Sequence, residues 1–495
     1  MPPTLLHYSD VENAYDDPDR IGRLAGRLRG LRDGTAVVCG TGDNTAPGVL
    51  SLVTEGRQAL PFFEAVGTDF ETFGNHDFDH GIDATAAVVR DSPQTWLTAN
   101  VEQDGVRPSG ARSGSSDERS EPPGVPSNEV KRGSGVERSD PPGERFLPEE
   151  TVSVAVREVD GRRLGFVGVT TRSARYNPGA GPLSFEDPVP AVREGVATLR
   201  EREVDDVVVL AHLGREDEHL ARETDVDVVL GGHVHDVTAE RIDGTVLTRP
   251  GVNGEVVFAV ELGETVRARR YSIDDAPVYE PVAEALRDRL VAADLDEVVA
   301  HVADPIERSD ELIAAGETRV GNLVADAYRW SSGADVGLQN SGGIRTGPPL
   351  GGDVTVADLV SVVPFEEELA LLSVTGAELR RVVREASGDV VEALPDGMWN
   401  GHFSGLSVVW NDDDREIERL RVGGEPVDDD ATYTVVTTEY LLGTDHEYPT
   451  LTPAHHVDSV GRQYDALADY ARSEGIDPEI EGRIVRRGRG GEREG

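Results

Sequence analysis

The stretch FGNHDFDHG, residues 73–81, is the most informative part of the sequence. It packs an amide, an imidazole and two carboxylates, those of Asn75, His76, Asp77 and Asp79, between glycines that allow the backbone to bend sharply. Residues that bind a ligand or take part in catalysis usually come from several loops of a fold. The role of this stretch therefore depends on the segments before and after it along the chain.

Residues 1–260 alternate short apolar runs, rich in β-branched residues, with helical stretches, which predicts an α/β fold. The clearest runs are AVVCGTGD (36–43), GFVGVT (165–170), DVVVLAHLG (206–214) and DVVLGGHVH (227–235). Each run ends in a polar or Gly-rich turn. This pattern indicates a buried strand with a functional loop at its carboxyl end.

Possible metal ligands follow five segments of this kind: Asp10 and Glu12, Asp43, the stretch 73–81, His212, and the pair His233 and His235. Strand ends converge on one edge of an α/β sheet, so these segments could build one site. The donors are imidazoles and carboxylates without a thiolate, a set that suits zinc, manganese, iron or cobalt. Each element alone has an ordinary explanation, such as a cap for Asp10. The ordered set favours a metal site.

The composition excludes several classes of protein. Lys and Arg number 48 and Asp and Glu 93, and the net charge of −45 argues against nucleic acid and membrane surfaces as partners. The single cysteine, Cys39, excludes a disulfide framework and a multi-Cys metal cluster. No apolar run approaches the roughly 20 residues of a membrane span. No basic-then-apolar leader precedes the first candidate strand, so we expect a cytoplasmic protein.

Lys131 is the only lysine in the chain. Dense carboxylates with almost no lysine are typical of proteins adapted to multimolar salt, in which screening removes most of the self-repulsion. A GC-rich genome alone would explain the preference for arginine, but it explains the acidity less well.

A length of 495 residues predicts two or three domains. We expect a first domain at residues 1–262, interrupted at 103–148 by a disordered insertion rich in Gly, Ser, Pro and charge. A helical linker is expected at 263–310, a second domain at 311–480 and a tail at 481–495. Within the second domain the pattern predicts helices at 320–330 and 374–386 and strands at 406–412 and 431–442.

The ordered motifs of the first domain resemble those of the calcineurin-like metallophosphoesterases. FGNHDFDHG together with the second domain is similar to the 5'-nucleotidase family, which also includes UDP-sugar hydrolases and 2',3'-cyclic phosphodiesterases. The resemblance covers nearly the whole chain apart from 103–148 and the tail. It implies an N-terminal four-layer αββα metallophosphoesterase sandwich and a C-terminal α+β 5'-nucleotidase domain.

The resemblance also implies roles for the candidate residues. It assigns Asp10 and His235 to a first metal, Asn75, His212 and His233 to a second, and Asp43 to both; His76 would be the catalytic imidazole and Asp79 would orient it. Where the family usually has His, this chain has Glu12. If Glu12 binds the metal, it would favour a harder ion such as manganese over zinc. Alternatively, a water molecule could occupy that ligand position.

Such a site implies a definite chemistry. Two cations roughly 3.5–4 Å apart lower the pKa of a bridging water and hold the phosphoryl oxygens for in-line attack. His76 would stabilise charge on these oxygens or protonate the leaving alkoxide. No covalent phosphoenzyme is required, and no nucleophilic Ser or Cys motif is visible.

The second domain contains candidate substrate-binding residues in NSGGIR (340–345), VVPFEEE and TEYLLGTDHEYP: Asn340, Arg345, Phe365, Tyr440 and Asp445. An Arg beside flexible Gly suits an anion, an aromatic pair can hold a planar base, and a carboxylate can accept from ribose hydroxyls. The resemblance implies that Asn340 and Arg345 contact the substrate, Phe365 and Tyr440 the base, and Asp445 the ribose. The family motifs NGGGIR and GGDG read NSGGIR and GTDHE here.

We therefore expect a two-metal phosphohydrolase that releases phosphate from nucleoside 5'-monophosphates or related nucleotides. A 2',3'-cyclic-nucleotide phosphodiesterase or a nucleotide-sugar hydrolase is the alternative among enzymes. A nucleotide-binding protein with a fossil site is the alternative without catalysis, and the intact ligand set together with His76 argues against it.

Overall fold

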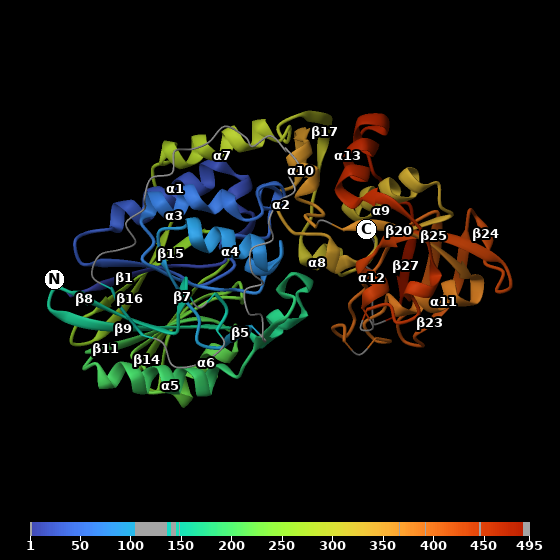
Figure 1. Ribbon diagram of the computed structural model, residues 1–495. Coiled ribbons are helices and arrows are strands. Elements are labelled where there is room, and N and C mark those ends of the chain that lie inside the picture. The colour runs from blue at the N-terminus through green and yellow to red at the C-terminus, as the bar shows by residue number, and fades with distance from the viewer. Residues whose placement is uncertain are drawn as a thin grey trace, which may run out of the picture. The chain divides into compact units, whose positions relative to one another are not determined.

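The computed structural model describes residues 2–103, 136–139, 145–147, 149–365, 367–391, 393–444 and 447–488. The chain divides into two compact units, Met1–Arg289 and Leu290–Gly495, which are described here one at a time (Figure 1). Most of the predicted insertion at 103–148 and the predicted ribose ligand Asp445 lie outside the described residues.

Two seven-stranded mixed sheets form the centre of the N-terminal unit. The first sheet runs in the order β16 (Val266–Ser272), β15 (Val256–Leu262), β1 (Thr4–Tyr8), β2 (Ala36–Gly40), β3 (Phe70–Thr72), β4 (Thr95–Leu97) and β7 (Thr151–Val152). The second runs in the order β13 (Val237–Ile242), β14 (Thr245–Pro250), β12 (Val228–Gly231), β11 (Asp206–His212), β9 (Arg162–Thr170), β8 (Val154–Val159) and β6 (Val136–Ser139). β6 belongs to the stretch predicted as an insertion, and it pairs antiparallel with β8.

The two sheets pack face to face around an apolar core. Phe70 of the first sheet and Phe166 of the second stack with ring centroids 4.2 Å apart, and Val37, Val208 and the other members of this cluster are buried. β11 is buried at every position, as expected for a strand covered on both faces. The continuous apolar runs of the sequence therefore correspond to strands of this sandwich.

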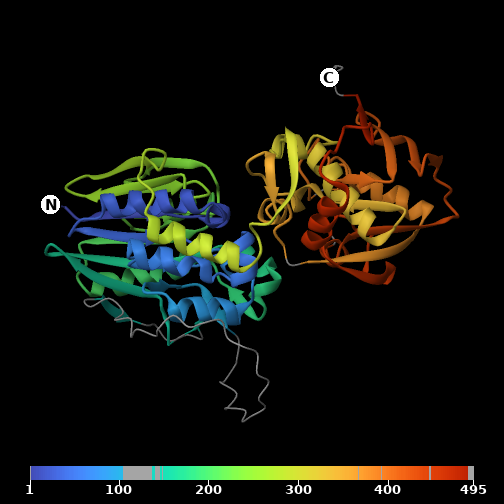
Figure 2. The same ribbon diagram turned by 90° about the horizontal axis from the view of Figure 1, so that it is seen from above.

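Helices cover the outer face of each sheet. α1 (Pro18–Leu31), α3 (Leu60–Val66), α4 (Ile82–Asp91) and α7 (Glu280–Ala292) lie on the side of the first sheet, and α5 (Pro188–Glu201) and α6 (Glu216–Glu223) on the side of the second (Figures 1 and 2). The layers thus follow the order helix, sheet, sheet, helix. The predicted four-layer αββα sandwich is confirmed.

The segment that leads into α7 packs closely on α1 at two glycines. The amide of Tyr279 donates to the carbonyl of Gly22 at 2.8 Å. A β-carbon at Gly26 would overlap the carbonyl oxygen of Pro277.

Residues 263–310, predicted as a helical linker, contain one helix, α7, between the strands β16 and β17 (Val298–Ile306). Arginines interrupt the apolar pattern of β16, and most residues of β17 are exposed or half-buried, so neither strand shows a clear apolar run in the sequence.

The C-terminal unit is an α+β structure, as predicted. Its five-stranded sheet has the order β21 (His402–Ser404), β18 (Val336–Gln339), β25 (Thr432–Thr438), β20 (Glu368–Thr375) and β26 (His456–Arg462). A four-stranded sheet contains β24 (Glu425–Pro426), β23 (Glu416–Val422), β22 (Leu406–Asn411) and β27 (Ile484–Arg487), and β17 pairs with β19 (Leu350–Thr355). The helices include α9 (Arg319–Ser332), α10 (Val356–Val360), α11 (Gly376–Glu385) and α13 (Gln463–Glu474).

Two details of the C-terminal unit differ from the sequence predictions. The strand predicted at 431–442 ends at Thr438, and the rest forms a short helix, α12 (Tyr440–Gly443). The predicted tail contributes β27, which pairs parallel with β22 and buries Ile484 in the core. Two apolar residues among arginines are too short a run to indicate a strand by pattern alone. Of the helices that the structure describes, none combines the length and the apolar character of a membrane span.

Candidate metal centre and substrate-binding residues

Asp43, His212 and His233 form the first group of candidate ligands. Asp43 and His233 follow β2 and β12, and His212 is the last residue of β11. Each of the three offers one ligand atom within 4.8 Å of the others. The Nε2 atom of His212 lies 3.0 Å from Oδ2 of Asp43, and the rings of His212 and His233 are 5.1 Å apart at their centroids. Segments that lie far apart in the sequence thus meet at one point.

Asp10, Glu12 and His235 form the second group, also with ligand atoms within 4.8 Å of one another. The Nε2 atom of His235 lies 3.2 Å from Oε1 of Glu12. Glu12, which stands where the related family usually has histidine, is therefore placed as a ligand would be.

Backbone hydrogen bonds join the two groups. The amide of His233 donates to both carboxylate oxygens of Asp10, at 3.0 and 3.3 Å. The amide of Asp10 donates to the carbonyl of Gly42 at 3.1 Å, and that of Glu12 donates to the carbonyl of Asp43 at 3.2 Å. The loops after β1 and β2 of one sheet and after β12 of the other therefore form one unit.

The backbone itself is constrained at these ligands. Asp10, Glu12, Asp43 and His233 have φ values of 47°, 43°, 52° and 74°, a left-handed region that residues with a side chain seldom adopt. Such conformations cost energy, persist only where the surroundings impose them, and concentrate at functional sites. Four of the predicted ligands share this property.

Two buried atoms of the site lack a hydrogen-bond partner and fit a cation. The Nδ1 atom of His212 donates to the carbonyl of Thr41 at 2.8 Å, which leaves the lone pair on Nε2 facing Asp43. Neither this Nε2 nor Oδ1 of Asn75, a predicted ligand, has a hydrogen-bond partner among the described residues. Unpartnered buried acceptors next to carboxylates are the donors that a divalent ion binds.

The pKa values indicate the same need for positive charge. Burial, together with the nearby Asp43 and Glu12 carboxylates, raises the pKa of Asp10 to about 7. Burial lowers the pKa of His212, but the Asp43 carboxylate outweighs it and raises that pKa to about 10. Metal binding at His212 therefore competes with protonation of its imidazole and should release a proton.

His76 and Asp79 form a pair beside the metal ligands. The Nδ1 atom of His76 lies 3.0 Å from Asp79 Oδ2, and the backbone amide of His76 donates to Asp43 Oδ1 at 2.7 Å. Asn177, which sequence reasoning missed, donates from Nδ2 to Asp79 Oδ1 at 2.6 Å and to the carbonyl of Asn75 at 2.7 Å. Asp79 therefore orients the imidazole, and Asn177 orients Asp79.

Asp77 organises the two loops that carry Asp43 and Asn75. Its buried carboxylate accepts from the backbone amides of Asp43, Thr45 and Gly74 at 3.0, 3.1 and 2.8 Å, and from the Thr45 hydroxyl at 2.7 Å. Its place inside FGNHDFDHG pointed to a role, but only the folded structure shows that the role is support rather than metal binding.

In the C-terminal unit the structure connects Asn340 and Tyr440 through Glu447. The Glu447 carboxylate accepts from the side-chain amides of Asn340 and Asn400 and from the Tyr440 hydroxyl, each at 2.9 Å. Glu447 was not predicted, although it lies in GTDHEY, where the sequence departs from the family motif. Tyr440 remains 39% exposed, so its ring is available to a ligand.

Arg345 and Phe365 form a second pair. The guanidinium carbon of Arg345 lies 5.0 Å from the centroid of the Phe365 ring, within range of a cation–π interaction. The Nε atom of Arg345 is buried without a hydrogen-bond partner among the described residues, which suits a guanidinium that awaits an anion.

The serine in NSGGIR has a structural explanation. The Ser341 hydroxyl donates to the carbonyl of Trp399 at 2.9 Å, and its amide donates to Asn400 Oδ1 at 3.0 Å. The side chain that stands here in place of glycine therefore anchors the loop that carries Asn340.

The N-terminal unit is thus a four-layer sandwich that carries two neighbouring groups of candidate metal ligands. Residues 298–453 match the family model "5'-nucleotidase, C-terminal domain". The chain is similar over its length to the solved 5'-nucleotidase precursor from Thermus thermophilus, with a TM-score of 0.74, 22% identity, and coverage of 98% of this chain and 99% of that one. The C-terminal unit thus carries a 5'-nucleotidase C-terminal domain, and the predicted resemblance to the 5'-nucleotidase family is confirmed.

Curated relatives agree with this family. They include the 5'-nucleotidase of Rattus norvegicus, 23% identical over 97% of this chain and 90% of that protein. Endonuclease YhcR of Bacillus subtilis is 25% identical over 79% of this chain. The trifunctional nucleotide phosphoesterase protein YfkN of the same organism is 22% identical over 97% of this chain. The chain spans about a third of the length of these two bacterial relatives, 31% and 34%. All three names are those of hydrolases, in agreement with the predicted enzyme class.

Proposed function

We propose that this protein is a two-metal phosphohydrolase that releases phosphate from nucleoside 5'-monophosphates or related nucleotides. The observation that carries the proposal is the connection of two ligand groups through Asp10, whose carboxylate belongs to one group and accepts the amide of His233 from the other. Ligands for two neighbouring cations are what two-metal hydrolysis of phosphoesters requires.

The ligand assignment follows the two groups. Asp10, Glu12 and His235 would hold one ion, His212, His233 and Asn75 the other, and Asp43 would contribute to both. When bound, the two ions would lower the pKa of a water molecule and neutralise the phosphoryl oxygens. Oxygen and nitrogen donors without sulfur suit manganese, zinc, iron or cobalt, and Glu12 favours manganese among them.

His76 would act on the leaving group. Its Nδ1 faces Asp79, so Nε2 is the nitrogen available to the substrate. Burial lowers the pKa of His76, but the Asp79 and Asp43 carboxylates outweigh it and raise it to about 10, so that the imidazole carries a proton at neutral pH. A protonated imidazole can donate to the leaving oxygen or stabilise the charge of the phosphoryl group.

We assign recognition of the nucleoside to the C-terminal unit. The exposed ring of Tyr440 and the Phe365 ring offer faces for a planar base, and Asn340 and Arg345 offer polar contacts. Asp445 stays a prediction for the ribose. The 2',3'-cyclic phosphodiesterase and nucleotide-sugar hydrolase activities differ in what the C-terminal unit must bind, and they share the metal chemistry.

A substrate panel tests this proposal. Phosphate release is measured from nucleoside monophosphates, cyclic nucleotides, a nucleotide sugar and p-nitrophenyl phosphate, with manganese, zinc or cobalt in concentrated KCl. We expect turnover of nucleoside monophosphates, and the variant Phe365→Ala should raise their KM more than that of p-nitrophenyl phosphate, which has no base to stack. Absence of turnover with every metal would favour a binding protein, and equal effects of Phe365→Ala on all substrates would remove the stacking role.

A further inference from the structure

A groove in the N-terminal unit begins at His233, one of the candidate metal ligands. Its near end is a cavity of about 410 Å³ lined by Thr171, by residues of η4 (Arg172–Tyr176), by Leu213 and Glu216, and by His233 itself. A second cavity of about 490 Å³ shares Arg172, Leu213 and Glu216 with the first. The two cavities are therefore the two ends of one groove.

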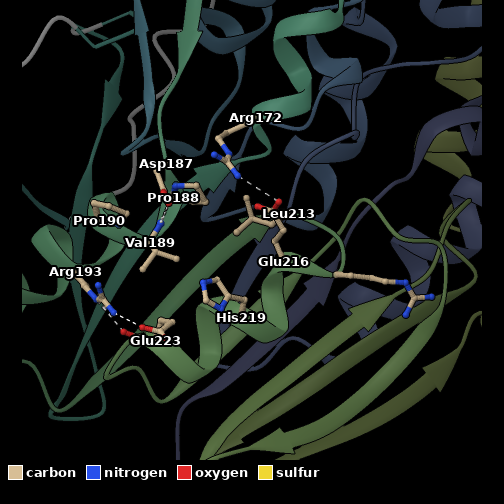
Figure 3. A pocket seen from close by; sticks show the side chains of 11 residues that line it. Arg172, Asp187, Pro188, Val189, Pro190, Arg193, Leu213, Glu216, His219 and Glu223 are labelled. Carbon is tan, nitrogen blue, oxygen red and sulfur yellow. Dashed lines mark hydrogen bonds and ion pairs between the residues drawn. The ribbon is translucent and has the colours of Figure 1, made fainter. Parts of the chain in front are cut away.

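The far end, drawn in Figure 3, is balanced in charge. Three arginines and three carboxylates line it: Arg172, Arg193 and Arg215, and Asp187, Glu216 and Glu223. Figure 3 shows Arg193 paired with Glu223, at 2.6 Å, while residues 188–190 add an apolar wall. An anion would therefore gain little at this end.

The near end has an excess of positive charge, with two arginines against one glutamate. The guanidinium of Arg175 stacks 4.7 Å from the centroid of the Tyr176 ring and donates to its hydroxyl at 2.7 Å; among the described residues it has no carboxylate partner. Tyr176 is 73% exposed. The ion pair between Arg172 and Glu216, at 3.7 Å between half-exposed side chains, is of a weak kind. Both guanidinium groups are thus available to an anion from solvent.

The near end lies on the side of the leaving group. Asn177 follows η4 directly, and its side chain bonds Asp79, the residue that orients His76. A β-carbon at Gly179 would overlap the carbonyl oxygen of Phe78, so the loop after η4 packs directly on the turn that carries His76. The backbone that follows Arg175 is therefore anchored beside the turn that carries His76.

We propose that Arg172 and Arg175, at the near end of this groove, bind a phosphate group other than the one that is cleaved. The inference rests on the proposed function and adds to it a site within the N-terminal unit. The bound phosphate would come either from the leaving group of a nucleoside diphosphate or from free inorganic phosphate. Guanidinium groups suit both, because each offers paired N–H donors to phosphate oxygens.

For a nucleoside diphosphate the step balances as a hydrolysis. Water forms a new bond to the terminal phosphorus, the bond from that phosphorus to the bridging oxygen breaks, and one proton passes to solvent. The nucleoside monophosphate leaves with the electron pair and the negative charge on the former bridging oxygen. The arginines would stabilise this charge. A nucleoside monophosphate substrate leaves as an alkoxide without a phosphate group, so the arginines would have no phosphate to bind in that reaction.

The first arm of the test compares matched substrates. The ratio of kcat/KM for a nucleoside 5'-diphosphate to kcat/KM for its 5'-monophosphate is measured for the metal-loaded full chain and for Arg175→Gln. Both substrates share base and ribose, so contributions of the C-terminal unit cancel. Loss of a charge-assisted contact should lower the ratio about tenfold or more. Arg267→Gln removes the same charge from an exposed position on β16 and should leave the ratio unchanged.

The second arm titrates inorganic phosphate into the same metal-loaded proteins by calorimetry. A falling ratio assigns the site to the phosphate of the substrate, and a loss of one bound phosphate equivalent with a constant ratio assigns it to free phosphate. If Arg175→Gln changes neither quantity relative to Arg267→Gln, the site does not exist. If no phosphoester is hydrolysed with any metal, the proposed function is wrong. The titration alone then shows whether the groove binds inorganic phosphate.

Discussion

Histidines of opposite electrostatic character lie within the candidate metal centre. Burial and the neighbouring His212 lower the pKa of His233 to about 4, whereas Asp79 and Asp43 outweigh burial and raise that of His76 to about 10. A neutral imidazole is a metal ligand, and a protonated one is a general acid. The two residues therefore suit different roles, His233 as a neutral ligand and His76 as a proton donor, whereas metal binding at His212 must displace the proton that the Asp43 carboxylate favours there.

The change His76→Ala tests this division. The variant should keep its metal content, because the ligand groups do not include the imidazole of His76, and should lose about 10²–10⁴ in kcat, the usual contribution of general acid catalysis. Metal analysis of the purified variant and steady-state kinetics check both parts. A parallel loss of metal would show that His76 is a ligand instead.

Glu367 gives a pH dependence to the C-terminal unit. Burial raises its pKa from 4.5 to about 7, despite hydrogen bonds from Thr438 and from the amide of Tyr440. The folded state therefore holds this proton more tightly than the unfolded state. The protonated carboxyl group adds its full contribution to the free energy of unfolding below about pH 4.5, and this contribution is lost as the pH rises through 7. Chemical unfolding across this range should show a steeper loss of stability in the wild type than in Glu367→Gln, by about 3 kcal/mol in total, because the other buried carboxyl groups titrate equally in both proteins. Identical slopes for the two proteins would contradict it.

At the scale of elements, α1 contains glycines in two different environments. A β-carbon at Gly26 would overlap Pro277, whereas nothing lies within 4 Å of such a carbon at Gly30. The same substitution on one helix therefore probes packing at one position and backbone entropy at the other.

The pair Gly26→Ala and Gly30→Ala should act in opposite directions. Gly30→Ala should stabilise the protein by about 0.5–1 kcal/mol, since alanine is the better helix former. Gly26→Ala should destabilise it by about 1–3 kcal/mol, because the segment before α7 must move away from α1. Denaturant unfolding measures both values, and a stabilising Gly26→Ala would mean that this packing is absent.

The sequence alone indicates several strands of the N-terminal unit and the candidate ligands at their ends. Apolar runs followed by His or Asp predicted β2, β11 and β12 and the residues after them, because a buried strand and its loop are local features. Asn177, Asp77 and Glu447 could not be assigned in this way, since their partners come from distant segments and only folding brings them together. β27 was missed for a related reason, because pairing with β22 rather than its own pattern makes it a strand.

At the scale of the whole molecule, charge dominates. A net charge of −45 on 495 residues opposes the compact state through self-repulsion. The many ion pairs of the described surface join exposed side chains, and such pairs contribute little each. We therefore expect screening by salt to stabilise the fold.

Stability should accordingly rise with KCl. Because the Debye length falls from about 10 Å at 0.1 M to about 3 Å at 1 M, most repulsion between surface carboxylates disappears over this range. The thermal unfolding midpoint measured between 0.1 and 2 M KCl should rise mainly below about 1 M and change less above it. A non-ionic osmolyte at equal osmolality serves as the control, and a midpoint that responds equally to both would rule out screening as the cause.

The order of strands in the first sheet bears on how the protein is made. β1 lies between β2, which leaves the ribosome soon after it, and β15, which follows about 250 residues later. At about 5–20 residues per second, one side of β1 stays open for roughly 10–50 s. An unpaired strand edge invites wrong partners. We therefore expect the soluble yield to depend on how long this edge stays open, so that expression hosts that translate faster should give a higher soluble yield.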